Sequence, residues 1–234
     1  MNDTLLSARI DGLFFGKVAR RWDGKEPSAI GKTSVTGHHE INEFGFVMDE
    51  QADLVIHGGP DKAIHHYATD HYADWIAEGE IPDGSQPAAF GENIASFGMT
   101  ENLLCIGDTL RLGTAVVQVS QGRQPCWKVS EHTINKNMAY LFQKTGRTGW
   151  YYRVLEPGIA GVEDTVSLLG RPQPEWTVER VTTARLTRRV SQEDAAILAV
   201  MPELADGWRT AFSKMAGGDL DEDTSRRLNG RNTD

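Results

Sequence analysis

Short apolar runs separated by glycine-rich turns fill about the first 170 residues of the chain. In the run 114–121, Val117 and Val119 alternate with Gln118 and Ser120, which is the two-residue period of a strand with one buried face. Similar runs predict further strands. The predicted strands lie at 13–21, 28–35, 51–60, 103–113, 114–121, 149–158 and 164–170. Many short strands with glycine turns, and no long alternation of strand and helix, predict a closed or nearly closed β-barrel.

Two segments among these strands change to a helical period. Apolar residues recur every three to four positions between Ile64 and Trp75, which predicts an amphipathic helix at 61–79 with Asp61 as its N-cap. The same spacing predicts a second helix at 132–146, and a glycine closes each of the two segments.

The pattern becomes helical after a proline-rich linker, Arg171-Pro172-Gln173-Pro174. Three short helices are predicted within 175–217, the second of them starting at Ser191 with a capping box. We therefore expect a mostly β domain at 1–171, a small C-terminal helical domain at 175–217, and a frayed polar tail at 218–234.

Composition and charge exclude several classes of protein. The chain has 234 residues and a net charge of −9, which argues against general nucleic-acid binding because that function needs a broad basic surface. No apolar run approaches the roughly 18 residues of a membrane span, and the first residues lack the apolar core of an export signal. With two cysteines in the chain, we expect a cytoplasmic protein without a structural disulfide.

The segment QGRQPCWK at 121–128 carries the candidate nucleophile, Cys126. Arg123 and Lys128 flank it, and nearby cations stabilise a thiolate. Pro125 fixes the backbone just before it, at the end of a predicted strand. Spacing alone leaves two interpretations open, a reactive thiolate and a buried structural thiol. Cys105, in the apolar run LLCIG, is expected to pack in the core.

Two further segments offer groups that could bind a ligand. In HGGPDKA (57–63), paired glycines can bring backbone N–H groups close to an anion and Lys62 adds a cation, although a tight turn explains the same residues. In FGENI (90–94), Glu92 and Asn93 could orient a ligand or brace a loop. Lys17, Lys25 and Lys32 could extend a phosphate-binding surface.

Three histidines, His65, His66 and His71, fall in the predicted helix at 61–79. His66 and Asp70 would share one face of that helix, because residues four apart are neighbours. Zinc sites need three or four well-spaced ligands, and the motif H-E-x-x-H is missing. Histidines stacked or hydrogen-bonded on a half-buried helix are therefore the preferred interpretation over a zinc site.

Five segments occur in an order that is more specific than any one of them: HGGPDKAIHHY, AAFGENI with FGMTE, IGDTLRLG, VVQVSQGRQPCWK and TGRTGWYYRVLEPG. Together they resemble the MOSC family, the molybdenum cofactor sulfurase C-terminal domain. The likeness is greatest to its YiiM-type members, in which a small helical domain follows the MOSC domain. The resemblance implies a MOSC-type β-barrel core with flanking helices and a cleft for the molybdenum cofactor (molybdopterin).

The resemblance also implies roles for particular residues. Cys126 aligns with the family's cysteine, and its thiolate would be the molybdenum ligand and the catalytic residue. Lys62 stands where many relatives would have arginine. Lysine keeps the positive charge but lacks the bidentate hydrogen-bond donor of the guanidinium group. Trp127, Trp150, Tyr151 and Tyr152 could stack on the pterin or pack in the core. The expected cofactor-binding residues are Lys32, His57, Gly58, Gly59, Asp61, Lys62, Gly91, Glu92, Asn93, Arg123 and Lys128.

The activity implied by the resemblance is reduction of N-hydroxylated compounds such as 6-hydroxylaminopurine to the amine. The expected partners are the small N-hydroxylated substrate and a separate electron-donor protein, a flavin or iron–sulfur reductase, because the chain has no flavin fingerprint and too few cysteines for a cluster. A homodimer and a domain-level association with pyridoxal phosphate are further expectations. The alternatives are a carrier of the cofactor or of sulfur without turnover, and metal-free thiol chemistry on Cys126.

Overall fold

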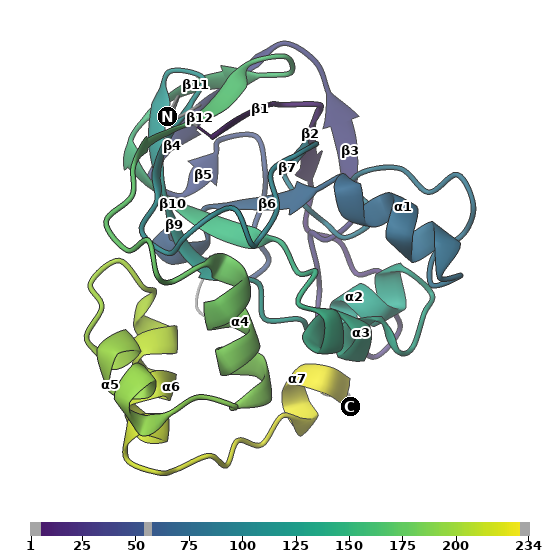
Figure 1. Cartoon of the computed structure of the whole chain (residues 1–234). Helices are drawn as coiled ribbons and strands as arrows, with labels where there is room; N and C mark the ends of the chain where they lie inside the picture. The colour runs from purple at the N-terminus through teal and green to yellow at the C-terminus, as the bar shows by residue number, and fades with distance from the viewer. Residues whose placement is uncertain (1–5, 54–57, 230–234) are drawn as a thin grey trace.

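A mixed nine-stranded sheet forms the body of the protein in the computed structural model, which describes residues 6–53 and 58–229 (Figure 1). Strands β6 and β7 run parallel, and the other neighbouring strands pair antiparallel. In sheet order the strands are β1 (Ser7–Arg9), β12 (Thr165–Gly170), β8 (Thr109–Leu112), β9 (Ala115–Gly122), β10 (Trp150–Glu156), β6 (Ile64–Ala68), β7 (Ile94–Ser96), β2 (Gly12–Gly16) and β3 (Lys32–Val35).

A smaller sheet packs against one end of the large one. It consists of β11 (Gly158–Gly161), β4 (His38–Asn42) and β5 (Gly45–Phe46). The rings of Phe15 and Phe46 lie 5.0 Å apart between the two sheets, and the inward side chains of both sheets share one hydrophobic core. The curled sheets form a half-barrel with flanking helices, which confirms the expected MOSC-type β-barrel architecture.

The strands predicted around 13–21, 28–35, 103–113, 114–121, 149–158 and 164–170 are all present, most of them shorter than expected. The helix predicted at 61–79 is wrong in its first half. A single 3₁₀ turn, η1 (Pro60–Lys62), leads into strand β6, and helix α1 (Asp70–Ala77) follows. Every residue of β6 is buried because one face of the strand packs in the main core through Ile64 and the other face packs in a second cluster through Tyr67, so it shows no alternation. His66 and Asp70 therefore share no helical face.

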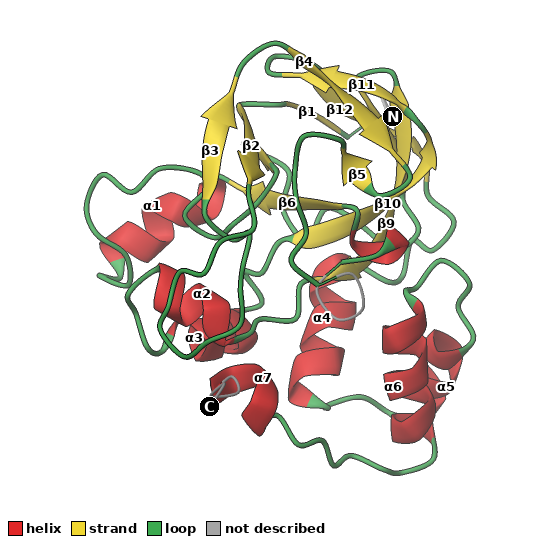
Figure 2. Ribbon diagram, turned by 180° about the vertical axis from the view of Figure 1, so that it is seen from behind, coloured by secondary structure: helices red, strands yellow, loops and turns green. Residues whose placement is uncertain are grey.

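The second predicted helix, at 132–146, is present from residue 138, and a short helix that was not predicted precedes it. Helix α2 (Trp127–His132) and helix α3 (Met138–Thr145) lie side by side, and Gly146 closes α3 in the left-handed conformation. Together with α1 they cover one side of the sheet (Figure 2). Their apolar faces meet in a second hydrophobic cluster, where Trp75 and Phe142 stack with ring centroids 5.7 Å apart. Residues 51–53 form no strand, and 54–57 of the predicted strand 51–60 lie outside the described residues.

The three helices predicted within 175–217 are α4 (Val178–Thr187), α5 (Gln192–Ala199) and α6 (Asp206–Ala216). The Ser191 side chain accepts a hydrogen bond from the Asp194 N–H at 3.0 Å, so the expected N-cap is present. Helix α4 packs on β9, where a Cβ atom on Gly122 would lie 1.9 Å from Thr182 Oγ1. The helices and the sheet thus share a continuous core.

The polar tail was expected to be frayed, and the structure differs from that expectation. Residues 225–229 form helix α7 (Ser225–Asn229), which returns to the body of the protein beside α2. Within the described part of the chain, no helix is long and apolar enough to cross a membrane.

Candidate functional site

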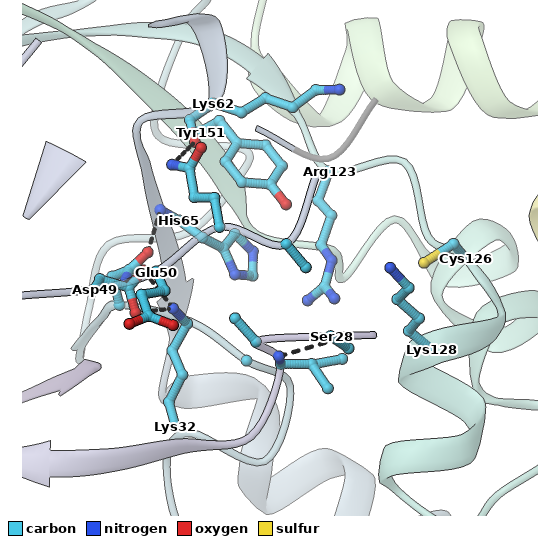
Figure 3. Close-up of a pocket in the computed structure, with 16 residues that line it drawn as sticks. Ser28, Lys32, Asp49, Glu50, Lys62, His65, Arg123, Cys126, Lys128 and Tyr151 are labelled. Atoms are coloured by element: carbon cyan, nitrogen blue, oxygen red, sulfur yellow. Dashed lines mark hydrogen bonds and ion pairs between the residues drawn. The ribbon is translucent and has the colours of Figure 1, made fainter. Parts of the chain in front are cut away.

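A cleft opens beside the ends of β3, β6 and β10, opposite the start of helix α2 (Figure 3). Seven of the residues predicted from the sequence line it: Lys32, Lys62, Gly91, Asn93, Arg123, Cys126 and Lys128. These seven residues come from four separate segments of the sequence that meet at one place.

Cys126 stands at the N-cap of α2 in an extended conformation, with φ −134° and ψ 171°. Its sulfur points into the cleft, and 7% of the residue is exposed. Cys105 is buried elsewhere in the core, where burial raises the pKa of its thiol and makes it a poor nucleophile. The geometry thus assigns the core-packing role to Cys105 and gives Cys126 access to a ligand.

Arg123 and Lys128 are two buried cations beside Cys126, with 7% and 5% exposure. Arg123 Nη1 donates to the carbonyl oxygen of Phe90 at 2.5 Å, and Lys128 Nζ donates to that of Pro27 at 3.3 Å. Across residues 6–53 and 58–229, neither cation forms an ion pair with a carboxylate. Buried charges without a directly paired counter-ion are costly, so these two cations favour an anion in the cleft.

Lys32 is compensated, unlike those two cations. Its Nζ lies 2.6 Å from both carboxylate oxygens of Asp49, and Asn93 Nδ2 donates to the same carboxylate at 2.8 Å. Burial lowers the pKa of Lys32, and the Asp49 charge opposes that shift. Asn93 Nδ2 also donates to the Phe14 carbonyl oxygen. Both N–H groups of the Asn93 amide are therefore used within the protein, and neither is left to donate to a ligand.

His65 and Tyr151 face each other from paired positions on β6 and β10, with ring centroids 4.9 Å apart. Burial and the nearby Arg123 charge lower the pKa of His65 well below its usual value, so the imidazole is neutral. Burial raises the pKa of Tyr151, so its phenol stays protonated. The cleft therefore adds two neutral hydrogen-bonding groups to its cations.

Sequence reasoning missed His65 as a site residue because it placed this residue on a helix. Tyr151 was one of four aromatic residues expected to stack on the pterin or pack in the core, and in Trp150-Tyr151-Tyr152 only its side chain is not fully buried. Trp150 and Tyr152 are fully buried, and Trp127 packs against Trp22 at 5.2 Å. The remaining cleft residues that were not predicted are Ser28, Ala29, Ile30, Asp49, Glu50, Gln51 and Ala52.

In the FGENI loop, Gly91 lines the cleft and the neighbouring Glu92 braces the loop. Gly91 lines the cleft at φ +76°, and a Cβ atom there would lie 2.6 Å from Ile30 Cγ1. Glu92 is fully buried away from the cleft, and its carboxylate accepts hydrogen bonds from Tyr72 Oη at 2.6 Å and the Ala88 N–H at 2.7 Å. Glu92 thus braces the loop that presents Gly91.

The HGGPDKA segment brings only Lys62 into the cleft among its described residues. The Gly59 N–H donates to Gln51 Oε1 at 3.2 Å, and a Cβ atom on Gly58 would collide with the same oxygen. Asp61 forms an ion pair with Arg153 at 2.7 Å. Burial lowers the pKa of Lys62, while charges on Asp53, Asp61 and Cys126 oppose the shift. His57 lies outside the described residues.

No group of three or more histidine, cysteine, aspartate or glutamate side chains is arranged to hold a metal within residues 6–53 and 58–229. His66 bonds instead to Tyr152 and Ser96, and His71 to Glu101 at 2.7 Å. One thiol beside two cations suits a metal whose other ligands come from an anionic organic cofactor, because a thiolate is a soft metal ligand and the cations match the anion. The residues present therefore fit a phosphate-bearing metal cofactor.

Comparison with known proteins defines the class to which this fold and cleft belong. A family model described as the MOSC domain matches residues 53–167. Protein YiiM of Escherichia coli is 35% identical over 222 residues, which cover 94% of this chain and 97% of that protein. The chain belongs to the MOSC domain family.

Within that family the chain is of the YiiM type. The crystal structure of YiiM from Escherichia coli superposes with a TM-score of 0.76 at 30% identity, covering 94% of this chain and 98% of the other. A protein of Gibberella moniliformis named "Reductase" is 39% identical over 170 residues, which cover 72% of this chain and 30% of the fungal one.

Proposed function

We propose that this protein is a molybdenum-cofactor-dependent reductase that converts N-hydroxylated compounds of the 6-hydroxylaminopurine type to their amines. The observation that carries the proposal is the position of Cys126 in a cleft beside Arg123 and Lys128, two buried cations that form no ion pair with a described carboxylate. Membership of the MOSC family and the fungal relative named as a reductase support it.

The residues around the cleft divide the work of holding such a cofactor. The Cys126 thiolate would be the protein's ligand to molybdenum, because soft thiolates suit this metal. Arg123 and Lys128 would neutralise the phosphate, and Lys62 adds charge from the opposite wall. When bound, the cofactor would supply the two electrons that cleave the N–O bond.

Reduction of an N–OH group consumes two electrons and two protons and releases one amine and one water. The chain must therefore deliver protons into a partly buried cleft. Lys62 is the group we assign to that role, because burial lowers the pKa of its ammonium and makes it a better acid. His65 stays neutral and Tyr151 protonated, which suits both for hydrogen bonds that orient a purine-like base.

The electrons must come from outside the chain, and we propose a separate flavin or iron–sulfur reductase as their source. The fungal relative named as a reductase leaves room for such a unit, because the region similar to this chain makes up only 30% of it. Two thiols that form no disulfide are consistent with the cytoplasmic location that we propose. A homodimer stays a prediction.

The decisive experiment combines cofactor analysis with turnover. Protein from a host that makes the cofactor is assayed for molybdenum and pterin, and for reduction of 6-hydroxylaminopurine by reduced benzyl viologen. We expect Cys126→Ala to lose metal and activity, whereas Cys105→Ala, the matched control, keeps both. Full loading and full activity in Cys126→Ala would refute the ligand role.

The same experiment separates the reductase from a carrier. A carrier would copurify with cofactor through Cys126 and yet reduce nothing when viologen is supplied. Wild-type protein that is fully loaded and inactive with several N-hydroxylated substrates would therefore replace the reductase by the carrier.

A further inference from the structure

The C-terminal segment after α6 crosses the surface and ends beside the loop that carries Cys126 (Figures 1 and 2). We call residues 219–228 the strap. Its helix α7 contacts α2, the helix that Cys126 caps. A polar tail that returns to this place requires specific contacts, because its composition does not favour a packed structure by itself.

Glu222 anchors the middle of the strap. Its carboxylate lies 2.8 Å from Arg185 and 2.5 Å from Arg188, both on or next to the end of α4. The hydrogen bond from Arg185 is the main cause that lowers the pKa of Glu222 to about 2. Gln124 Nε2 donates to the same carboxylate at 3.4 Å, so the anchor reaches the loop two residues before Cys126.

Arg227 holds the other end of the strap against that loop. Its Nη1 donates to the carbonyl oxygen of Pro125 at 2.5 Å, and its Nη2 donates to Gln143 Oε1 on α3 at 3.1 Å. The residue directly before Cys126 is thereby tied to both α7 and α3. The Nε–H of Arg227 is buried and has no hydrogen-bond partner among the described residues.

The guanidinium also brings a positive charge to the residue directly before Cys126, because it donates to the Pro125 carbonyl oxygen. Nearby cations stabilise a thiolate. The strap thus contributes a charge as well as a mechanical tie.

We propose that Arg227 is a positioning residue of the Cys126 site, supplied by the strap, which fixes the Pro125-Cys126 backbone and places a cation beside the thiolate. This inference rests on the proposed role of Cys126 as a ligand. It assigns the polar C-terminal segment a part in cofactor retention, because a loosened loop would present the sulfur in many orientations rather than one.

The test is carried out on metal-free protein in a Cys105→Ser background, so that iodoacetamide reports on Cys126 alone. The alkylation rate is followed from pH 6 to 10, and its midpoint and its high-pH plateau are measured separately. We expect Arg227→Met to raise the midpoint, because a cation is lost, and to raise the plateau about two- to fivefold, because the loop is freed. Arg227→Lys should restore the midpoint while the plateau stays raised.

A second variant removes the anchor and leaves the Arg227 cation in the chain. Glu222→Gln is expected to raise the plateau with a smaller change of midpoint, and it keeps the proposal testable if Arg227→Met fails to fold. Arg111→Met, at an exposed position of β8, is the matched control for loss of one positive charge and should alter neither quantity.

Wild-type midpoint and plateau in a folded Arg227→Met protein, or an unchanged plateau in Glu222→Gln, would overturn the proposal. Molybdenum occupancy provides the second readout. It should fall at least threefold in Arg227→Met and recover partly in Arg227→Lys. Alkylation is measured without metal, so it tests the role of Arg227 independently of the cofactor. If Cys126→Ala keeps its cofactor, the ligand role is refuted whatever the alkylation result.

Discussion

Lys32 and Asp49 form a buried ion pair in the wall of the cleft, with the ammonium nitrogen 2.6 Å from each carboxylate oxygen. Each side chain is 7% exposed. Arg123 and Lys128 lack such a pair, since those two buried cations bond to carbonyl oxygens and form no ion pair with a described carboxylate. One wall of the cleft is therefore self-compensated, and the other is left positive for a ligand.

Breaking the pair should destabilise the fold. Asp49→Asn leaves the buried Lys32 charge uncompensated, and we expect the free energy of unfolding to fall by about 3 kcal/mol. Denaturant titration by circular dichroism measures it. Glu50→Gln is the control, because Glu50 pairs with Lys17 at an exposed site and should matter far less. A loss in Asp49→Asn no larger than in the control would contradict this account.

Removing one of the two buried cations that form no ion pair should stabilise the cofactor-free protein and weaken cofactor binding. Lys128→Met removes a buried charge, so the cofactor-free protein should become more stable, by about 1 kcal/mol. The same change should lower molybdenum and pterin content of the purified protein about tenfold, because an anion loses its partner. Lys136→Met, an exposed charge, is the control for both measurements. A destabilised Lys128→Met protein with normal cofactor content would show that Lys128 is structural.

Buried histidines should make the protein sensitive to acid. Burial lowers the pKa of His66 from 6.5 to about 3, and that of His65 in the same direction. The unfolded chain then binds protons that the folded chain refuses, so stability is lost as pH falls from about 6.5 toward 3. At pH 5 the His66 contribution alone is a loss of about 2 kcal/mol relative to pH 7. Urea unfolding at both pH values checks it, and His66→Gln should flatten the dependence.

Gly91 should tolerate no side chain. In Gly91→Ala the residue would keep φ +76° and its Cβ would lie 2.6 Å from Ile30 Cγ1, so we expect a loss of about 2 kcal/mol and a reduced cofactor content. Gly84→Ala is a matched control, because Gly84 has φ +79° with open space around its Cβ position. The difference between the two thermal unfolding temperatures isolates the steric part. Equal losses would mean that backbone strain alone acts at Gly91.

Local signals predicted much of this protein. Strand β9 followed from the alternation of Val117 and Val119, and the cap of α5 from Ser191, because both depend on neighbours in the sequence. The same holds for part of the site. Arg123, Cys126 and Lys128 occur within six residues of one loop and helix start, so their meeting in the cleft required no knowledge of strand pairing.

Long-range packing decided the rest. Strand β6 was mistaken for helix because burial on both faces erases the two-residue period, and only its pairing with β10 and β7 makes it a strand. The same pairing sets His65 beside Tyr151, which is distant in the sequence. Arg227 reaches Pro125 across 102 residues. Contacts of this kind depend on how the whole chain closes on itself, and no window of the sequence contains them.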